Sequence, residues 1–189
     1  MTEHVCPYWA GYFLANRLRK LLQNPHKILA PYVKPGMTVL DVGSAMGFFS
    51  LPLAEMVGPS GKVVCVDVQS KMLQVLRRRD AEAGLTERIE THVSSEDSIG
   101  LQGRDANFDF ALAFTMMHEV GNQTNFLREM YQMLKPGAKL LLTEPIKHVS
   151  RTEFDRTVSL AQREGFVPTD HPLIRLSHAV VLQKPLRNQ

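Results

Sequence analysis

The sequence TVLDVGSAMGFFSLPLAEMVGPSGKVVCVDV, residues 38–68, decides the expected fold of this chain. It begins with an apolar strand that runs into Asp41 and continues through a loop of small residues at 43–47. An apolar helix of about a dozen residues follows, and a second apolar strand ends in Asp67. A strand, a glycine loop, a helix and a strand in this order form a βαβ unit with a carboxylate at the end of each strand.

The loop and its neighbouring carboxylates indicate a ligand that carries a nucleoside. Gly43 and Gly47 lack a Cβ, so the backbone can turn sharply there and a ligand can approach closely. Open α/β sheets bind ligands at the carboxyl ends of their strands, where Asp67 can accept both ribose hydroxyls. A dinucleotide would need G-x-G-x-x-G, but here Ala45 stands at the second glycine position and Phe48 at the third.

Asp41 indicates the charge of that ligand. A carboxylate beside the loop repels a pyrophosphate and attracts an ammonium and a sulfonium group, which together describe S-adenosyl-L-methionine. The stretch 41–47 resembles the first motif of class I S-adenosylmethionine-dependent methyltransferases, an acidic residue followed by G-x-G-x-G. Ala45 departs from this motif, which implies weakened rather than abolished cofactor binding. An α/β sheet with a glycine turn and no nucleotide is the alternative.

The resemblance implies a set of cofactor-binding residues at the carboxyl ends of the strands: Asp41, Gly43, Ser44, Ala45, Gly47, Asp67, Val68, Met72, Ser95, Glu96, Asp97 and Phe114. In the resembled family the residues up to position 47 hold the methionine part, and Asp67 holds the ribose. Val68, Met72 and the turn after a strand expected at 88–93 hold the adenine. Core packing is the alternative role for Met72, and an exposed capped turn is the alternative for residues 94–97.

The candidate catalytic residue follows the apolar run 108–114, which predicts a strand buried on both faces. Met116, Met117, His118 and Glu119 come next, where the sulfonium and the methyl acceptor would meet. Phe114 and the two methionines would form an apolar wall. A histidine with a pKa near neutrality can take a proton from a nucleophile, so His118 is the candidate base. A structural histidine at the start of a helix is the competing interpretation, and the more common one.

The rest of the chain completes an α/β fold. A helix is expected at 122–135 and a strand at 139–143, followed by Glu144 at the strand end. The Leu-Lys-Pro-Gly stretch between them resembles a later motif of the same family. A final antiparallel hairpin is expected over 166–183. The predicted fold is a doubly wound, mostly parallel seven-stranded sheet with a C-terminal antiparallel hairpin, the Rossmann-like methyltransferase fold.

The expected organisation is an N-terminal helical segment, residues 1–34, and one compact methyltransferase domain, residues 35–189. Apolar residues near a 3.6-residue period predict an amphipathic helix over 8–23. In the resembled methyltransferases such a segment covers the cofactor cleft. Packing of this helix on the sheet is the alternative.

Composition narrows the function classes. The 189 residues are 44% hydrophobic and 22% charged, as expected for one globular domain. The net charge of +3 is modest, and the arginines at 77–79 are expected to be a solvated helix face, so no nucleic-acid site is predicted. No apolar run approaches the ~20 residues of a membrane span, and no signal peptide is apparent. Two cysteines indicate no disulfide framework, and a cytoplasmic location is expected.

The seven histidines are scattered, and no metal site is predicted. We expect an enzyme that transfers a methyl group from S-adenosyl-L-methionine to a small-molecule acceptor, with the attacking atom and the oligomeric state left open. A non-catalytic adenosyl-ligand-binding subunit that serves a partner is one alternative, which Ala45 keeps open. An NAD-dependent oxidoreductase is the other, and Asp41, Phe48 and the terminal hairpin disfavour it.

Overall fold

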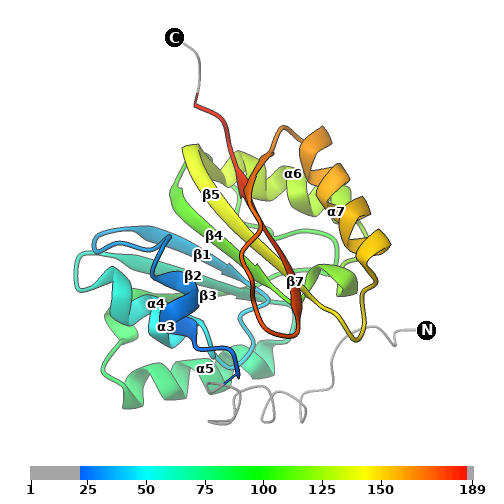
Figure 1. Ribbon diagram of the computed structural model, residues 1–189. Helices are drawn as coiled ribbons and strands as arrows, with labels where there is room; N and C mark the ends of the chain where they lie inside the picture. The colour runs from blue at the N-terminus through cyan, green and yellow to red at the C-terminus, as the bar shows by residue number, and fades with distance from the viewer. Residues whose placement is uncertain (1–21, 187–189) are drawn as a thin grey trace. The chain divides into compact units, whose positions relative to one another are not determined.

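The computed structural model describes residues 22–186, which fall into two compact units, the first ending at Ser94 and the second beginning at Ser95 (Figure 1). The helix expected at 8–23 lies outside the described residues, apart from its last two positions. The same holds for most of the N-terminal segment 1–34. The role of that segment therefore stays a prediction.

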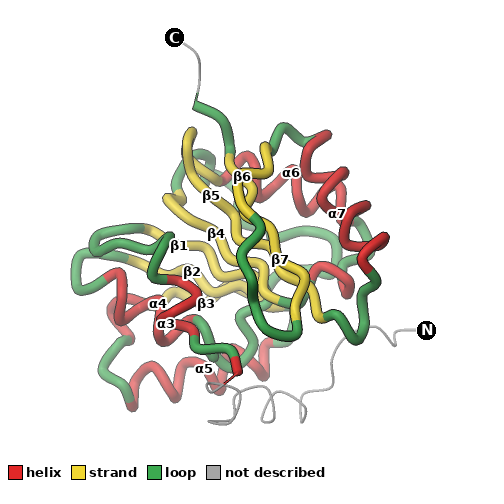
Figure 2. The backbone as a smooth tube through the Cα atoms, viewed as in Figure 1, coloured by secondary structure: helices red, strands yellow, loops and turns green. Residues whose placement is uncertain are grey.

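Among residues 22–94, the first unit has three parallel strands and three α-helices. Figure 2 shows the strands β1, β2 and β3 side by side. Strand β2 pairs with both β1 and β3. The elements are α3 (Pro25–Leu29), β1 (Thr38–Val42), α4 (Ser50–Val57), β2 (Lys62–Asp67), α5 (Ser70–Glu82), the short 3₁₀-helix η1 (Thr86–Arg88) and β3 (Ile89–Val93). Side chains of β1 and β2 are buried along almost their whole length, as expected for parallel strands covered by helices.

Helix α4 has eight residues, which is shorter than the dozen expected from the apolar run. Gly47 adopts a φ of +83°, which no right-handed helix contains, so the chain stays in turns up to Phe49. The side chains of Phe48 and Phe49 are nevertheless buried. The expected helix was longer because these two apolar residues were counted in it, but they are buried from a turn.

Among its described residues, 95–186, the second unit has four strands and two α-helices. Strands β4 and β5 are parallel, whereas β7 is antiparallel to both β5 and β6. The elements are β4 (Phe108–Phe114), the short 3₁₀-helix η2 (Met117–Glu119), α6 (Gln123–Met133), β5 (Leu134–Pro145), α7 (Arg151–Arg163), β6 (Val167–Asp170) and β7 (Ser177–Gln183). Helices α6 and α7 pack against each other (Figure 1).

The helix expected at 122–135 ends earlier, at Met133, so its predicted C-terminus is wrong. Leu134 already belongs to β5 and pairs with Phe108 of β4. Lys135 Nζ lies 2.6 Å from Asp109 Oδ1, which fixes the same stretch to β4. Tertiary pairing therefore overrides the local helical pattern at this boundary.

The strand expected at 139–143 is present but longer, because β5 runs from Leu134 to Pro145. Ser150 and Glu153 form a capping box at the start of α7, with Glu153 Oε2 accepting the Ser150 N–H at 2.8 Å. Strands β6 and β7 form the expected C-terminal hairpin. The seven strands of the sheet are mostly parallel, and the strands at the C-terminal end are antiparallel. This arrangement confirms the predicted α/β fold class. Within residues 22–186, no helix combines the length and the apolarity needed to cross a bilayer.

Candidate functional site

The glycine loop of the first unit is held against the end of β2. The backbone N–H groups of Gly43 and Ser44 both donate to Val66 O, at 2.8 and 3.0 Å. Gly43 and Gly47 have φ angles of +72° and +83°, in the region that favours glycine. A Cβ on Gly47 would come within 2.3 Å of Leu76 Cδ1, because α5 packs closely under the loop. Both glycines are therefore required by the turn itself.

Ala45 occupies the one glycine position of the resembled motif at which this chain has another residue. Its φ is +47°, a left-handed conformation that costs a residue with a Cβ roughly 1–2 kcal/mol. Its N–H donates to Asp67 Oδ2 at 2.9 Å, and this bond to a carboxylate offsets part of that cost. The loop thus keeps the glycine-type backbone shape with alanine in place.

Asp67 joins the loop to the end of β2. Its Oδ1 accepts the N–H of Gln69 at 2.8 Å, and its Oδ2 accepts the N–H of Ala45. Burial raises the pKa of Asp67, and the two amide donors oppose that rise. A carboxylate oxygen can accept two hydrogen bonds, so both oxygens keep acceptor capacity for a ligand.

Asp41 is the second buried carboxylate of this region. Its Oδ2 accepts the Ser50 hydroxyl at 2.6 Å. Burial raises the pKa of Asp41 to about 7, the Ser50 hydrogen bond opposes this, and the negative charge of Asp67 adds to it. Sequence reasoning missed Ser50, because no motif links a serine in the helix to a carboxylate in the strand before it.

Ser44 supplies a further polar group at the loop. Its hydroxyl oxygen is buried and has no hydrogen-bond partner within the described part of the chain. Buried polar groups in proteins are nearly always paired, so an orphaned hydroxyl in a glycine loop indicates a place for a ligand. The first unit therefore brings together Asp41, the loop and Asp67 as expected.

Arg79 corrects the expectation that the arginines at 77–79 are only a solvated face. Arg77 and Arg78 are exposed, but Arg79 is half-buried and donates from a guanidinium nitrogen to Met46 O in the glycine loop. Burial lowers its pKa. Helix α5 therefore supports the loop with a charged donor as well as with Leu76.

The residues expected around the adenine differ in exposure. Val68 is 36% exposed, whereas Met72 is buried in α5 at 2%, which agrees with its alternative role in core packing. Ser95 and Glu96 are exposed in the second unit. Asp97 is engaged locally, since its Oδ1 accepts the Asn122 N–H at 3.1 Å at the start of α6.

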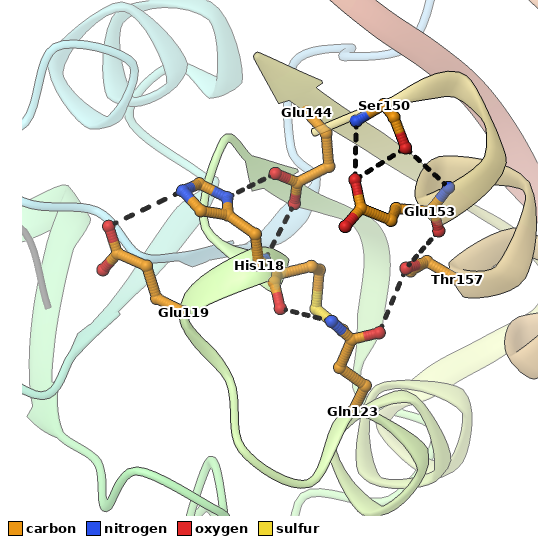
Figure 3. Close-up of polar contacts among 8 residues, drawn as sticks. His118, Glu119, Gln123, Glu144, Ser150, Glu153 and Thr157 are labelled. Atoms are coloured by element: carbon orange, nitrogen blue, oxygen red, sulfur yellow. Dashed lines mark hydrogen bonds and ion pairs between the residues drawn. The ribbon is translucent and has the colours of Figure 1, made fainter. Parts of the chain in front are cut away.

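His118 is held by two carboxylates in the second unit (Figure 3). Its Nδ1 lies 2.5 Å from Glu144 Oε2, and its backbone N–H donates to Glu144 Oε1 at 3.3 Å. On the other side of the ring, Nε2 lies 3.9 Å from Glu119 Oε1. The sequence placed Glu144 at a strand end but gave no sign that it would contact His118.

The charge environment of His118 favours its protonated form. The hydrogen bond to Glu144 is the main reason why the pKa of His118 is raised, partial burial lowers it, and the charges of Glu144 and Glu119 raise it further. The side chain of Glu144 is only 1% exposed, whereas that of His118 is 29% exposed. The histidine can therefore exchange a proton with a ligand or with water.

The segment that carries His118 is anchored to both helices of the second unit. Gln123 Nε2 donates to Met117 O at 2.8 Å, and Gln123 Oε1 accepts the Thr157 hydroxyl of α7 at 3.0 Å (Figure 3). Phe114 and Met117, expected in an apolar wall, are both buried. Thr115 between them has a φ of +57°, which is unusual for a β-branched residue and is often found at functional sites.

Metal ligation is a separate question for these carboxylates and imidazoles. Across the described ranges, no three His, Cys, Asp or Glu side chains are grouped so that they could hold a metal ion. The candidate chemistry thus rests on proton transfer at His118 and on the polar groups of the glycine loop.

Comparisons with known proteins agree with this geometry. Residues 33–168 match the family model of a methyltransferase domain. The ubiquinone/menaquinone biosynthesis C-methyltransferase of Hahella chejuensis is 33% identical over 112 residues, which are 59% of this chain and 44% of that protein. The demethylmenaquinone methyltransferase of Symbiobacterium thermophilum is 33% identical over 120 residues, 64% of this chain and 47% of that protein.

The chain spans about half the length of these two curated relatives, with 44% and 47% of each covered. A solved structure is similar over nearly its whole length. The S-adenosylmethionine-dependent methyltransferase from Aquifex aeolicus has a TM-score of 0.85 and 27% identity, with 95% of this chain and 100% of that chain covered.

Proposed function

The chain belongs to the methyltransferase domain family, within the class I S-adenosylmethionine-dependent methyltransferases, and we propose that it transfers a methyl group from S-adenosylmethionine to a small-molecule acceptor. The observation that carries the proposal is the glycine loop, which donates hydrogen bonds to Val66 and Asp67 at the end of β2. A second buried carboxylate, Asp41, lies beside this loop. When bound, the cofactor supplies a methyl group on a positively charged sulfur. An NAD-dependent oxidoreductase is set aside by the family match.

The residues of the first unit fit this cofactor. Asp41 and the loop would hold the methionine part, since a buried carboxylate attracts an ammonium group. Asp67 would accept the ribose hydroxyls with its remaining acceptor capacity, and the orphaned Ser44 hydroxyl would find a partner in the ligand. Two buried carboxylates at the loop oppose the binding of a pyrophosphate, which distinguishes this site from a dinucleotide site.

The remaining cofactor contacts are proposed from the resemblance. Val68 is exposed enough to contact an adenine, and the turn Ser95–Glu96 would meet its amino group. Met72 and Asp97 are already engaged, the first in the core and the second at α6. Both residues would therefore contribute to the site through their backbone positions and not through their side chains.

For the acceptor, we propose a small molecule whose attacking atom loses a proton during the reaction. His118 is the proposed base, because an imidazole that can accept a proton stands in η2, shortly after the end of β4. The name of the Hahella chejuensis relative describes a C-methyltransferase of ubiquinone and menaquinone biosynthesis, and the name of the Symbiobacterium thermophilum relative describes methylation of demethylmenaquinone. An electron-rich ring carbon, as in a hydroquinone, is therefore the first acceptor class to test. The cytoplasmic location and the lack of a nucleic-acid partner stay predictions of the sequence.

Methyl transfer tests the proposal directly. The purified chain is incubated with S-adenosylmethionine labelled in the methyl group and with a panel of hydroquinones, phenols and thiols. We expect label in an extractable acceptor, and heat production when S-adenosylhomocysteine, but not NADH, is titrated into the protein. Binding without transfer to any acceptor pool would instead favour the adenosyl-ligand-binding subunit that serves a partner.

The pKa of Asp41 gives a pH-dependence for cofactor binding. Because burial raises that pKa to about 7, Asp41 is largely protonated at pH 5.5 and half ionised at pH 7. A ligand ammonium binds the ionised form, so affinity should rise by roughly tenfold from pH 5.5 to pH 7. Calorimetric titration with S-adenosylhomocysteine at several pH values measures this change.

Two variants control this pH-dependence. Asp41→Asn should bind more weakly, with an affinity that hardly changes over the same range. Ser50→Ala removes the hydroxyl that stabilises the carboxylate, so the transition should move to higher pH. An affinity of the unmodified protein that is constant between pH 5.5 and 7 would contradict the assignment of Asp41 to the ligand ammonium.

A further inference from the structure

We propose that Glu144 is a positioning residue that holds His118 in the tautomer with the proton on Nδ1, leaving Nε2 free to take a proton from the methyl acceptor. This inference rests on the proposed function, because it assigns a role in methyl transfer to a carboxylate that the sequence did not connect with His118. The two residues lie 26 positions apart and come from the ends of two neighbouring strands.

The geometry is that of a carboxylate–histidine pair. Both oxygens of Glu144 bind the same residue: one accepts the backbone N–H of His118 at 3.3 Å, and the other lies 2.5 Å from Nδ1. Two bonds to one residue fix the position of its main chain and the orientation of its ring together (Figure 3). Since an ionised carboxylate only accepts hydrogen bonds, the ring nitrogen facing it must carry the proton.

The burial of Glu144 gives a reason for this arrangement. The carboxylate is 1% exposed, and a buried carboxylate is costly unless it is paired. Within the described residues, the hydrogen-bond partners of its side chain are the backbone nitrogen and Nδ1 of His118. A residue needed only to fill space at the end of β5 would be apolar, as Leu140, Leu141 and Leu142 of the same strand are.

The proton balance of the step is simple. As the attacking atom of the acceptor forms its bond to the methyl carbon, the bond from that carbon to the sulfur of the methyl donor would break, with S-adenosylhomocysteine as the leaving group. The proton of the attacking atom would pass to Nε2 of His118. The ring becomes an imidazolium with a proton on each nitrogen, and the negative charge of Glu144 compensates it. The proton then leaves Nε2 for solvent, which the 29% exposed side chain can reach. No oxidant or metal takes part in this step.

Three titratable groups of the second unit face His118. Glu144 lies at the end of β5, Glu119 lies on η2 beside Nε2, and the ring of His148 lies parallel to that of His118 with centroids 6.3 Å apart. Glu119 Oε1 is 3.9 Å from Nε2, beyond hydrogen-bonding distance. Glu119 can attract the His118 ring when the ring is charged, but it does not compete with Glu144 for the proton of the neutral ring.

The first test observes the ring itself and needs neither cofactor nor acceptor. In the full chain labelled with ¹⁵N-histidine, long-range ¹H–¹⁵N correlation spectra report which ring nitrogen carries the proton. We expect neutral His118 to be protonated at Nδ1, and its titration midpoint to lie above the ordinary value for histidine, because its pKa is raised chiefly by the hydrogen bond to Glu144. A free histidine prefers the proton on Nε2, so the two tautomers are distinguishable.

Two variants separate the charge from the hydrogen bond. Glu144→Gln keeps an acceptor for Nδ1–H but removes the charge, so the titration midpoint of His118 should fall. Glu144→Ala removes both, so the neutral ring should lose its preference for Nδ1–H. Glu119→Gln is the matched control: it removes a carboxylate from the other side of the ring, and it should leave the tautomer unchanged and shift the midpoint less.

The second test follows turnover against pH with the labelled-methyl assay. The base must be unprotonated, so the rate should rise with pH through the raised pKa of His118. In Glu144→Gln this rising limb should move to lower pH, and the plateau should fall by at least about tenfold because a weaker, looser base remains. The affinity for S-adenosylhomocysteine should stay within twofold.

The outcomes distinguish the pairing from the proposed function. A neutral His118 with its proton on Nε2, or a midpoint that Glu144→Gln does not change, overturns the positioning role whether or not methyl transfer occurs. If the spectra are as expected but the rising limb of the rate against pH does not move in Glu144→Gln, the pair has no part in catalysis. The expected spectra without any methyl transfer support the pairing and count against the proposed function alone. A variant that only lowers the melting temperature, with the pH profile intact, indicates a structural carboxylate and also overturns the proposal.

Discussion

Replacing Asp67 with alanine is expected to weaken the binding of S-adenosylhomocysteine by about 1–3 kcal/mol, because hydrogen bonds to a charged group are lost. This corresponds to an increase of about 5- to 150-fold in Kd. The carboxylate has two tasks in the structure, since it would accept the ribose hydroxyls and it already accepts the N–H groups of Ala45 and Gln69. Isothermal titration calorimetry at pH 7.5 measures the change.

A second buried aspartate in the same unit provides the control. Asp80 is 2% exposed and accepts the Thr86 hydroxyl at 2.9 Å, near the C-terminal end of α5. Asp80→Ala should lower the free energy of unfolding while leaving the ligand affinity within twofold. If Asp67→Ala binds as tightly as the unmodified chain, the ribose lies elsewhere and the assignment of Asp67 is wrong.

The first unit could be predicted well from the sequence because its decisive features are local. A glycine loop between an apolar strand and an apolar helix requires positive φ angles, and the structure has them at Gly43 and Gly47. Asp67 was placed by its position after four buried residues of β2. In such a βαβ unit, residues close in sequence are also close in space, so periodicity and turn residues carry most of the information.

The contacts that escaped prediction join side chains of different helices and strands. Ser50 reaches Asp41 across the glycine loop, and Glu144 reaches His118 across two strand ends. The second contact depends on the register between β4 and β5, in which Phe114 pairs with Thr143. That register places the residue after Thr143 beside the segment after Phe114, but no local pattern in the chain reveals it.

The wrong boundaries have the same origin. The helix expected to run to Lys135 ends at Met133, because Leu134 is extended and pairs with Phe108 of β4, although its N–H still donates to Met130 O. Helix propensity differs by less than about 1 kcal/mol among such residues, so strand pairing decides between the two. At Ala45 a contact to another element also outweighs a local preference, since this residue adopts a left-handed φ and donates its N–H to Asp67.

Replacing His118 with alanine is expected to lower kcat by about 10²- to 10⁴-fold, the usual contribution of a general base. The labelled-methyl assay with the acceptor found in the panel measures this loss. The affinity for S-adenosylhomocysteine should be unchanged within twofold, because the proposed contacts of His118 are to the acceptor and not to the cofactor. The variant also leaves the buried Glu144 carboxylate without the imidazole, so its free energy of unfolding should fall as well, and turnover is measured at a temperature at which both proteins are folded.

The control for this loss is another histidine of the second unit. His171 follows β6, and its side chain is exposed, so His171→Ala should keep full turnover. Raising the pH separates two roles of His118 in the unmodified protein: a base works better above its pKa, whereas a cation that stabilises negative charge on the acceptor works worse. A His118→Ala variant with at least half of the normal kcat would mean that the acceptor loses its proton to water, and that alignment alone accounts for the rate.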